Sequence, residues 1–285
     1  MSENKGYTHP ELVVDADWVE AHLRDPRVRL IEVDVDSSAY DQGHIPGAVS
    51  FNWQKELQDQ VVRAPLSRQH LEELLARAGV SNDTTIILYG DNNNWFAAWA
   101  LWILNYYGHS DVRLLDGGRV KWLADKREIT TEVPSYPRAT YHAQALHPEI
   151  RALRDRVLHD LGNANVALVD VRSPAEYSGE LLAPAHLPQE GAQRGGHIPG
   201  AANIPWSLAV RDDGTFKSAD ELRALYGGKG VTPDKEVIAY CRIGERSSHT
   251  WFVLNYLLGY PRVRNYDGSW TEWGSLIEAP IEKSV

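Results

Sequence analysis

The stretch Val237–Ser247 reads VIAYCRIGERS and contains Cys241, the only cysteine of the 285-residue chain. Four β-prone residues precede the cysteine and a helical pattern follows the loop, so the sequence predicts a strand, a tight loop and a helix in that order. The backbone N–H groups of so short a loop converge on the sulfur, and the positive end of the helix adds to them. Such surroundings favour a thiolate over a thiol. We therefore predict that Cys241 is a nucleophile.

Two arginines of the same loop, Arg242 and Arg246, support this prediction. A guanidinium group stays charged, so an anion that approaches the sulfur would meet fixed positive charge. The alternative is a buried apolar cysteine, a common fate for this residue type. The flanking arginines favour the catalytic interpretation.

The chain contains two copies of one unit. A shift of 151 residues aligns Trp122 with Trp273 without a gap, and the motif GHIPGA occurs at residues 43–48 and again at 196–201. A repeat of this length indicates a duplicated domain rather than a solenoid, whose units run to about 20 to 50 residues. The histidine of the motif is expected to be structural, since it recurs in the copy that has no cysteine.

Both copies alternate strand-like and helix-like segments, which is typical of an α/β fold. We predict two tandem domains, each a mainly parallel sheet flanked by helices, over residues 11–133 and 148–282. A proline-punctuated linker covers about 134–147. The predicted strands include 28–33 and 85–89 in the first domain and 166–169, 237–240 and 263–266 in the second, and the predicted helices cover 71–78 and 253–258.

The two copies differ where the cysteine lies. Gly90 takes its place in the first copy, and the following residues 91–94 read DNNN, without sulfur or arginine. The first domain is therefore expected to be inactive. The second copy carries about 16 extra residues, roughly Ser178–Gly195, and added loops often shape sites. This insertion contains Glu190 and Arg194.

Further arginines of the second copy are candidate anion ligands. Arg172 follows a predicted strand and Arg194 precedes the second GHIPGA motif, so both are expected near the carboxyl edge of the sheet, where α/β folds bind ligands. A structural ion pair is the alternative for each, with Asp170 close to Arg172 in sequence. His249, soon after the loop, is expected to lie on a helix surface.

Composition narrows the function classes. A net charge of -10 argues against a general nucleic-acid binder. No apolar run has the length of a membrane span or resembles a signal peptide, so a cytoplasmic location is expected. The chain has no metal-binding motif such as Cys-x-x-Cys, so neither a metal nor a cofactor is expected.

Together, these features resemble the two-domain rhodanese family, the thiosulfate sulfurtransferases. The resemblance rests on the tandem GHIPGA motifs, the Cys241–Arg246 loop, the strand end Asp170–Arg172, and Asp267–Ser269 with Trp273. It covers residues from about 11 to 282. It implies that a persulfide forms on Cys241 and passes sulfur to cyanide or another thiophilic acceptor, such as a dithiol.

The resemblance also assigns roles within the loop. Arg242 and Arg246 would hold the sulfonate oxygens of thiosulfate, with Arg172 and Arg194 as further candidates. Backbone N–H groups would stabilise the persulfide, and they belong to Ile243, Gly244, Glu245 and Ser247. Two joined copies reduce the need to dimerise, so a monomer is expected.

The donor remains open between two compounds. Some relatives that use thiosulfate have lysine where Ile243 stands and arginine where Glu176 stands, and both charges are missing here. Relatives that use 3-mercaptopyruvate usually have small residues after the cysteine, whereas Arg242 follows it in this chain. Thiosulfate is favoured.

Two other classes of function compete with sulfur transfer. A cysteine-dependent phosphatase places five residues between cysteine and arginine, whereas four separate Cys241 from Arg246. A non-catalytic binding module is the second rival, and the decayed loop of the first copy shows how such a module arises. The intact loop of the second copy disfavours it.

Overall fold

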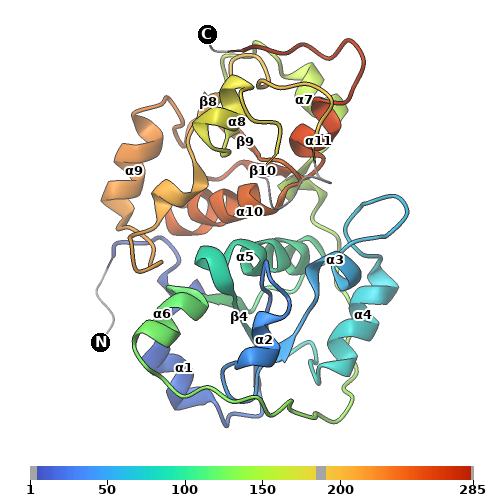
Figure 1. The fold of residues 1–285 in the computed structure, drawn as a ribbon, viewed down its shortest axis with the longest axis vertical. Coiled ribbons are helices and arrows are strands. Elements are labelled where there is room, and N and C mark those ends of the chain that lie inside the picture. Colours follow the sequence, from blue (N-terminus) through green and yellow to red (C-terminus); the bar gives the residue numbers. More distant parts are fainter. Residues whose placement is uncertain (1–4, 184–190, 284–285) are drawn as a thin grey trace. The chain divides into compact units, whose positions relative to one another are not determined.

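The computed structural model describes residues 5–183 and 191–283, which form two compact units (Figure 1). The first unit consists of residues 10–147 with 210–216, and the second of residues 5–9, 148–209 and 217–283 within the described ranges. Each unit thus includes a short segment from the other half of the sequence. Glu190, in the inserted segment, lies outside the described residues.

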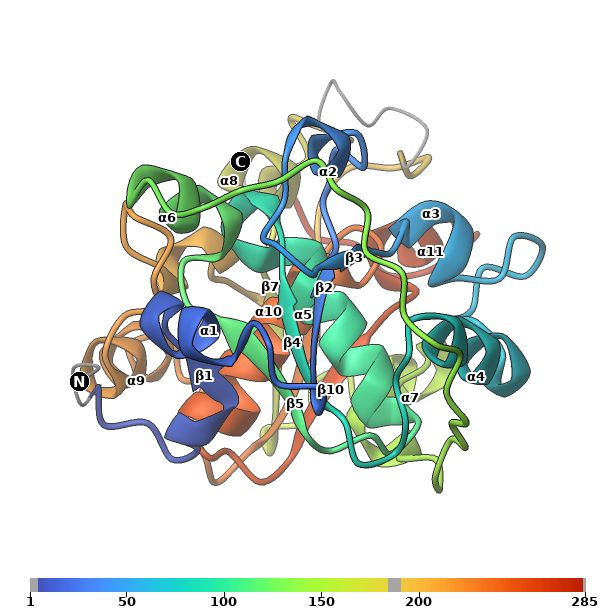
Figure 2. The ribbon, with the colours of Figure 1, turned by 90° about the horizontal axis from the view of Figure 1, so that it is seen from below.

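The first unit is built on a five-stranded parallel sheet with the order β1-β5-β4-β2-β3. Helix α5 packs on β4 and β5, and Figure 2 shows it running beside β4. The strands are β1 (Val13–Val14), β2 (Val28–Glu32), β3 (Val49–Ser50), β4 (Thr85–Tyr89) and β5 (Val112–Leu115). The helices are η1 (Pro10–Leu12), α1 (Ala16–His22), α2 (Ala39–Gln42), α3 (Trp53–Glu56), α4 (Arg68–Arg77), α5 (Asp91–Tyr106) and α6 (Gly118–Ala124).

The second unit repeats this topology, with the strand order β6-β10-β9-β7-β8 and parallel pairing. Helix α10 packs on β9 and β10. The strands are β6 (Arg151–Ala152), β7 (Val166–Asp170), β8 (Ala202–Asn203), β9 (Glu236–Tyr240) and β10 (Val263–Tyr266). The helical segments are η2 (Pro148–Ile150), α7 (Arg154–His159), α8 (Pro174–Ser178), η4 (Trp206–Ala209), α9 (Ala219–Gly227), α10 (Glu245–Phe252) with a π-helical turn (Val253–Leu257), and α11 (Ser269–Trp273).

The two sheets confirm the predicted fold class, two α/β domains with parallel sheets flanked by helices. The predicted strands are present with their ends moved by one residue at most, because runs of β-branched and aromatic residues favour extended backbone. The helix predicted at 253–258 is present as the π-helical turn Val253–Leu257, which continues α10. Gly259 follows it with a φ of 69°, a conformation that favours glycine at a helix end.

The repeated GHIPGA motifs make the same contacts in both units. The Ile45 N–H donates to the Tyr89 hydroxyl at 3.1 Å, and the Ile198 N–H donates to the Tyr240 hydroxyl at 3.0 Å. Their histidines stack on Tyr40 and Tyr177 respectively, and each contacts that tyrosine's carbonyl through Nδ1. These histidines therefore hold the motif against α2 and α8, a structural role as the repetition indicated, while the isoleucine N–H groups hold it to the end of the central strand.

Candidate active site

Cys241 directly follows β9, the central strand of the second sheet. Tyr240, the last residue of β9, pairs with Asp170 of β7 on one side and with Tyr266 of β10 on the other. The carboxyl ends of three strands therefore meet beside the cysteine. This is the edge at which open α/β sheets bind ligands.

The loop after Cys241 curls back on the sulfur. The Gly244 N–H donates to Sγ at 3.1 Å, and the Ser247 N–H is a further hydrogen-bond donor to it. Gly244 has a φ of 97°, and a Cβ there would lie 2.6 Å from the Asp267 Cα. The tight turn thus requires glycine at this position.

The segment after β10 holds the loop in place. The Cys241 N–H donates to Ser269 Oγ at 3.1 Å, and the Cys241 carbonyl accepts from the Trp270 N–H at 3.1 Å. Asn265 Nδ2 donates to the Gly244 carbonyl at 2.9 Å. These hydrogen bonds fix the loop backbone. The motif Asp267–Ser269, on which the resemblance also rests, therefore has a structural role beside the cysteine loop.

The acidic side chain in contact with the sulfur is that of Glu245, the first residue of α10. Cys241 Sγ donates to Glu245 Oε2 at 3.3 Å, and Arg242 Nη2 lies 3.7 Å from Glu245 Oε1. All three residues are buried. Sequence reasoning considered only the backbone of Glu245. The available signal was its spacing, four residues after the cysteine at a helix start.

Arg246 is held by Glu176 of α8. Its two terminal nitrogens donate to the two carboxylate oxygens, each at 2.9 Å, and both side chains are buried. Burial alone would raise the pKa of Glu176, but the hydrogen bonds and charge of Arg246 outweigh it and lower this pKa to about 2. The pair is therefore ionised, and Arg246 shares its charge with a partner that the sequence did not reveal.

Arg172 and Arg194 bind other parts of the second unit. The Arg172 guanidinium donates to both Asp170 oxygens and to the Gly196 carbonyl at 2.7 Å, and it is fully buried. Arg194 donates to carbonyls of the C-terminal segment, including Gly274 and Ala279. Arg172 thus forms the ion pair that was the structural alternative, whereas Arg194 binds backbone carbonyls instead of an acidic side chain. The contact of either arginine with a substrate stays a prediction.

The surroundings of the Cys241 sulfur shift its pKa upward. Burial raises its pKa, and the neighbouring Glu245 carboxylate raises it further, against the opposing effects of Arg246 and the Ser247 N–H. The direction of this shift is opposite to the thiolate expected from the sequence. Burial is its largest cause, and the Glu245 carboxylate in contact with the sulfur is the second.

His249 also differs from expectation. It is fully buried on α10, edge-on to Trp206 with ring centroids 5.3 Å apart, rather than on a helix surface. Burial lowers its pKa to about 3, so the imidazole is neutral at physiological pH. It therefore adds no charge to the site.

The equivalent loop of the first unit is closed by its own polar groups. Asn94 accepts from the Gly90 N–H at 3.0 Å and donates to the Leu115 carbonyl at 2.6 Å. The Asp91 carboxylate accepts from the Val35 N–H at 2.7 Å. A Cβ on Gly90 would lie 2.1 Å from the Val33 carbonyl oxygen, so the backbone leaves no room for a cysteine here.

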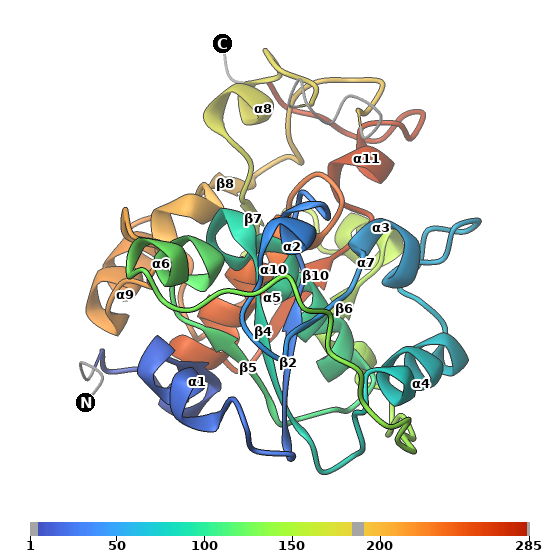
Figure 3. The same cartoon turned by 60° about the horizontal axis from the view of Figure 1, so that its bottom comes forward.

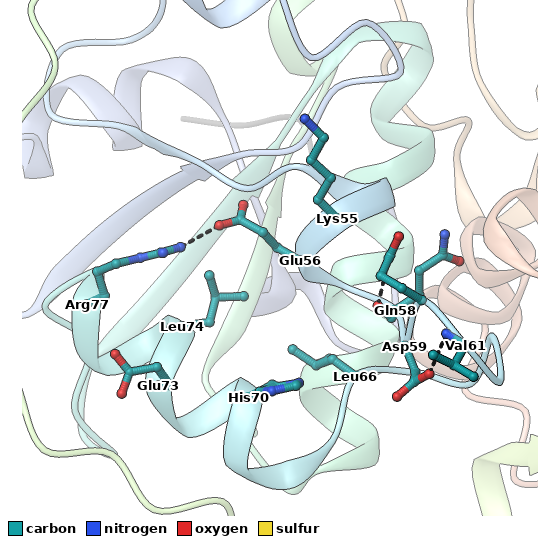
Figure 4. A pocket seen from close by; sticks show the side chains of 11 residues that line it. Lys55, Glu56, Gln58, Asp59, Val61, Leu66, His70, Glu73, Leu74 and Arg77 are labelled. Carbon is teal, nitrogen blue, oxygen red and sulfur yellow. Dashed lines mark hydrogen bonds and ion pairs between the residues drawn. The ribbon is translucent and has the colours of Figure 1, made fainter.

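A pocket of about 420 Å³ in the first unit lies away from this loop. It is bounded by α3, α4 and the segment between them, and Figure 4 shows Glu56 and Arg77 forming an ion pair across it. Figure 3 shows α3 above α4 on the same side of the first unit. Its remaining polar lining includes Lys55, His70 and Glu73, and it contains no nucleophilic side chain comparable to Cys241.

Within residues 5–183 and 191–283, no group of three or more histidine, cysteine or acidic side chains is arranged to hold a metal ion. In the same ranges, no helix combines the length and the apolar character needed to cross a lipid bilayer.

Comparison with known proteins places the chain among characterised families. The model of the rhodanese-like domain matches residues 15–125 and again residues 153–276. The chain is 58% identical over 281 residues to the sulfur carrier protein TtuD of Thermus thermophilus, covering 98% of this chain and 99% of that one. It is 59% identical over 272 residues to a Saccharopolyspora erythraea protein named "Putative thiosulfate sulfurtransferase", covering 95% and 96%.

A solved structure shares the fold over most of both chains. The 3-mercaptopyruvate sulfotransferase of Escherichia coli aligns with a TM-score of 0.79 and 30% identity, covering 91% of this chain and 98% of that one. The two matches to the domain model coincide with the two sheets, and the cysteine loop lies in the second. The chain therefore belongs to the rhodanese family of sulfurtransferases.

Proposed function

We propose that the protein transfers the outer sulfur of thiosulfate to a thiophilic acceptor through a persulfide on Cys241. The observation that carries this proposal is the position of the chain's only thiol. It follows the central strand β9, accepts the Gly244 N–H at 3.1 Å, and shares its loop with Arg242 and Arg246.

The reaction divides into two half-reactions. In the first, the Cys241 thiolate attacks the outer sulfur of thiosulfate, the sulfur–sulfur bond of the donor breaks, and sulfite leaves with its electron pair. In the second, a nucleophile such as cyanide or a thiolate attacks the outer sulfur of the persulfide. The Cys241 sulfur leaves with the bonding electrons, so the enzyme returns to its starting state.

The loop supplies the stabilisation that these steps need. Arg242 and Arg246 offset repulsion between the anionic donor and the sulfur and hold the sulfonate oxygens. The persulfide then lies in the cradle of loop N–H groups, which belong to Ile243, Gly244, Glu245 and Ser247. Arg172 and Arg194 are further candidate ligands of the donor in this proposal. Arg172 binds Asp170 at the end of β7, and Arg194 binds the C-terminal segment.

The names of relatives support a mobile sulfur atom. The Saccharopolyspora relative is named for thiosulfate, and the Thermus relative is named a sulfur carrier protein. A persulfide fits both descriptions, since it is loaded by a small donor and unloaded by an acceptor. We place cyanide or a dithiol as the acceptor, and a monomer in the reducing cytoplasm as the working form.

A second donor, 3-mercaptopyruvate, is favoured by one observation. Glu176 and Glu245 lie within 2.9 Å and 3.7 Å of Arg246 and Arg242, so they offset the positive charge available to a dianion. A singly charged donor meets less repulsion there. The Escherichia coli enzyme of the same fold is named for this compound.

A phosphatase is disfavoured by the length of the loop. Phosphatase chemistry places five residues between cysteine and arginine, whereas four separate Cys241 from Arg246.

The decisive experiment compares the two donors at steady state. Thiocyanate formed from cyanide is measured with thiosulfate and with 3-mercaptopyruvate, and a mass gain of about 32 Da on the protein reports the persulfide. A higher kcat/KM with thiosulfate supports the proposal. A higher value with 3-mercaptopyruvate replaces the donor, and absence of the mass gain with both refutes persulfide chemistry. Hydrolysis of an aryl phosphate without thiocyanate formation would favour the phosphatase.

A further inference from the structure

The contact between the Cys241 thiol and the Glu245 carboxylate has no role in the two half-reactions described above. The thiol donates to Glu245 Oε2 at 3.3 Å, and both residues are at most 1% exposed. Glu245 is the first residue of α10, and helical side chains point back toward the N-terminal end of their helix. This geometry directs the carboxylate onto the cysteine loop.

The charges around this contact are balanced. Arg246 is bound at 2.9 Å by Glu176, and Arg242 lies 3.7 Å from Glu245, so two arginines face two carboxylates. With the cysteine as a thiol, these four groups carry no net charge. Loss of the thiol proton to water would instead leave two anions in direct contact in a buried site, which is electrostatically costly.

A proton that moves from the sulfur to the carboxylate avoids this cost. We propose that Glu245 is a catalytic residue that accepts the Cys241 proton when the sulfur donor is attacked and returns it when the persulfide is discharged. The inference rests on the persulfide chemistry proposed above and assigns its proton transfers to one side chain.

The proton balances over the cycle. In the first half-reaction, the S–H bond of Cys241 breaks, an O–H bond forms on Glu245, and a sulfur–sulfur bond forms on Cys241. The sulfur–sulfur bond of thiosulfate breaks, so sulfite leaves as the dianion and the persulfide carries one negative charge. In the second, the acceptor takes the outer sulfur, the bonding electrons return to the Cys241 sulfur, and that sulfur recovers the proton from Glu245. Neither half-reaction exchanges a proton with water.

Protonation of Glu245 also changes the field at the loop. The neutral carboxyl no longer offsets the charge of Arg242, 3.7 Å away. The positive charge on Arg242 therefore acts on the anionic donor at the stage when sulfite is leaving. Formation of the nucleophile and stabilisation of the leaving group are coupled through one proton.

The proposal predicts an unusual pH dependence. Because the proton stays within the pair, persulfide formation is independent of pH between about pH 6 and pH 8. The surrounding groups keep their charges in this range, since the pKa of Glu176 is lowered to about 2 and burial lowers the pKa of His249 to about 3. The other charged groups around the loop are held in ion pairs and are Arg242, Arg246, Asp267 with Arg151, and Asp170 with Arg172.

The test measures single-turnover sulfite release after mixing the full-length protein with thiosulfate across this pH range. Thiolate absorbance at about 240 nm is recorded in parallel, with Cys241→Ser as the blank. For the wild type we expect a rate that changes less than about twofold while the thiol stays protonated. For Glu245→Gln we expect a rate that follows its thiolate absorbance, rising about tenfold per pH unit below the pKa of the thiol.

Two further variants keep the test sharp. Glu245→Asp keeps the charge but withdraws the carboxylate from the sulfur, so it should also show the tenfold slope, and it serves if the glutamine variant does not fold. Asp220→Asn makes a carboxylate-to-amide exchange in the first turn of α9, where the side chain is 95% exposed, and should behave as the wild type.

The outcomes separate the two proposals. If the wild type forms neither sulfite nor a persulfide, the proposed function fails. If the persulfide forms but wild type and Glu245→Gln share one pH dependence and one thiolate titration, the role of Glu245 is refuted while the proposed function stands.

Discussion

The loops after β4 and β9 occupy equivalent places in two sheets of identical strand order but have opposite chemical character. The loop after β9 presents Cys241 to backbone N–H groups, with its arginines matched by carboxylates. The loop after β4 begins with Gly90 and is closed by Asn94 and Asp91. The contacts that stabilise the sheet therefore do not involve the reacting groups.

The contrast shows which residues maintain the fold and which make the site. Tyr89 and Tyr240 make the same hydrogen bond to the GHIPGA motif in both units, so this contact is structural. The cysteine, the arginines and their acidic partners occur only in the second unit. Chemistry in this architecture resides in one exchangeable loop and in the carboxylates that balance it.

Replacing the nucleophile should have the largest effect on this contrast. Cys241→Ser makes the second loop as inert as the first, because oxygen does not form the persulfide, and sulfur transfer should fall by at least about a thousandfold. Thiocyanate formation measures it. The thermal midpoint should stay near that of the wild type, and appreciable residual turnover would contradict the mechanism.

Breaking the buried ion pair of the second unit should come next. Arg246→Ala leaves the Glu176 carboxylate buried without its bidentate partner, which should cost about 3–5 kcal/mol of unfolding free energy. Loss of a charged hydrogen bond to the donor should cost about 1.5–3 kcal/mol in kcat/KM. Urea unfolding and donor kinetics measure the two effects.

The matched control for that variant is Arg223→Ala. Arg223 pairs with Asp220 on the exposed surface of the same unit, so its loss should change stability little. Equal losses of unfolding free energy in the two variants would argue that burial does not make the Arg246 pair more important for stability than an exposed pair.

Adding one carbon to the first loop should have a smaller effect. Gly90→Ala forces a Cβ to within 2.1 Å of the Val33 carbonyl oxygen, so the backbone must shift, at a cost of about 1–3 kcal/mol measured by urea unfolding. Gly227→Ala is the control, since nothing lies within 4 Å of its Cβ position. A neutral Gly90→Ala would mean that the first loop has room for a side chain.

The last comparison concerns pH and Asp34, an acid that accepts a hydrogen bond from the Asp91 N–H of the first loop. Burial and the nearby Glu32 raise the pKa of Asp34 from 3.8 to about 8. Because the folded state holds this proton more tightly than the unfolded chain, Asp34 lowers stability increasingly as pH rises from about 4 to 8. Asp34→Asn should therefore raise the thermal midpoint more at pH 8 than at pH 4.

The second unit should show the opposite sign. The pKa of Glu176 is lowered to about 2, so its stabilisation is present above the usual value of 4.5 and is lost as pH falls toward 2. Glu176→Gln should lower the midpoint at neutral pH and have little effect near pH 2. Equal shifts at the two pH values, for either variant, would contradict these assignments.

The sequence allowed the fold and the nucleophile to be predicted because both have local signatures. Alternating strand and helix patterns gave β4, β9 and β10 almost residue by residue, and duplication made the second copy a check on the first. The same comparison singled out Cys241, since Gly90 stands at the matching position. The predicted domain limits at 133 and 148 remain predictions, and the structure assigns the segment 210–216 to the first unit.

Sequence alone determined that one thiol follows a strand beside two arginines, because strand, loop and helix are encoded by neighbours along the chain. Only the tertiary structure decided which charged groups surround that thiol. Glu176 reaches Arg246 across 70 positions of sequence, and Glu245 faces the sulfur only because the loop turns at Gly244. Charge at a buried site depends on which groups the fold brings within a few ångströms, and no local pattern records those distances.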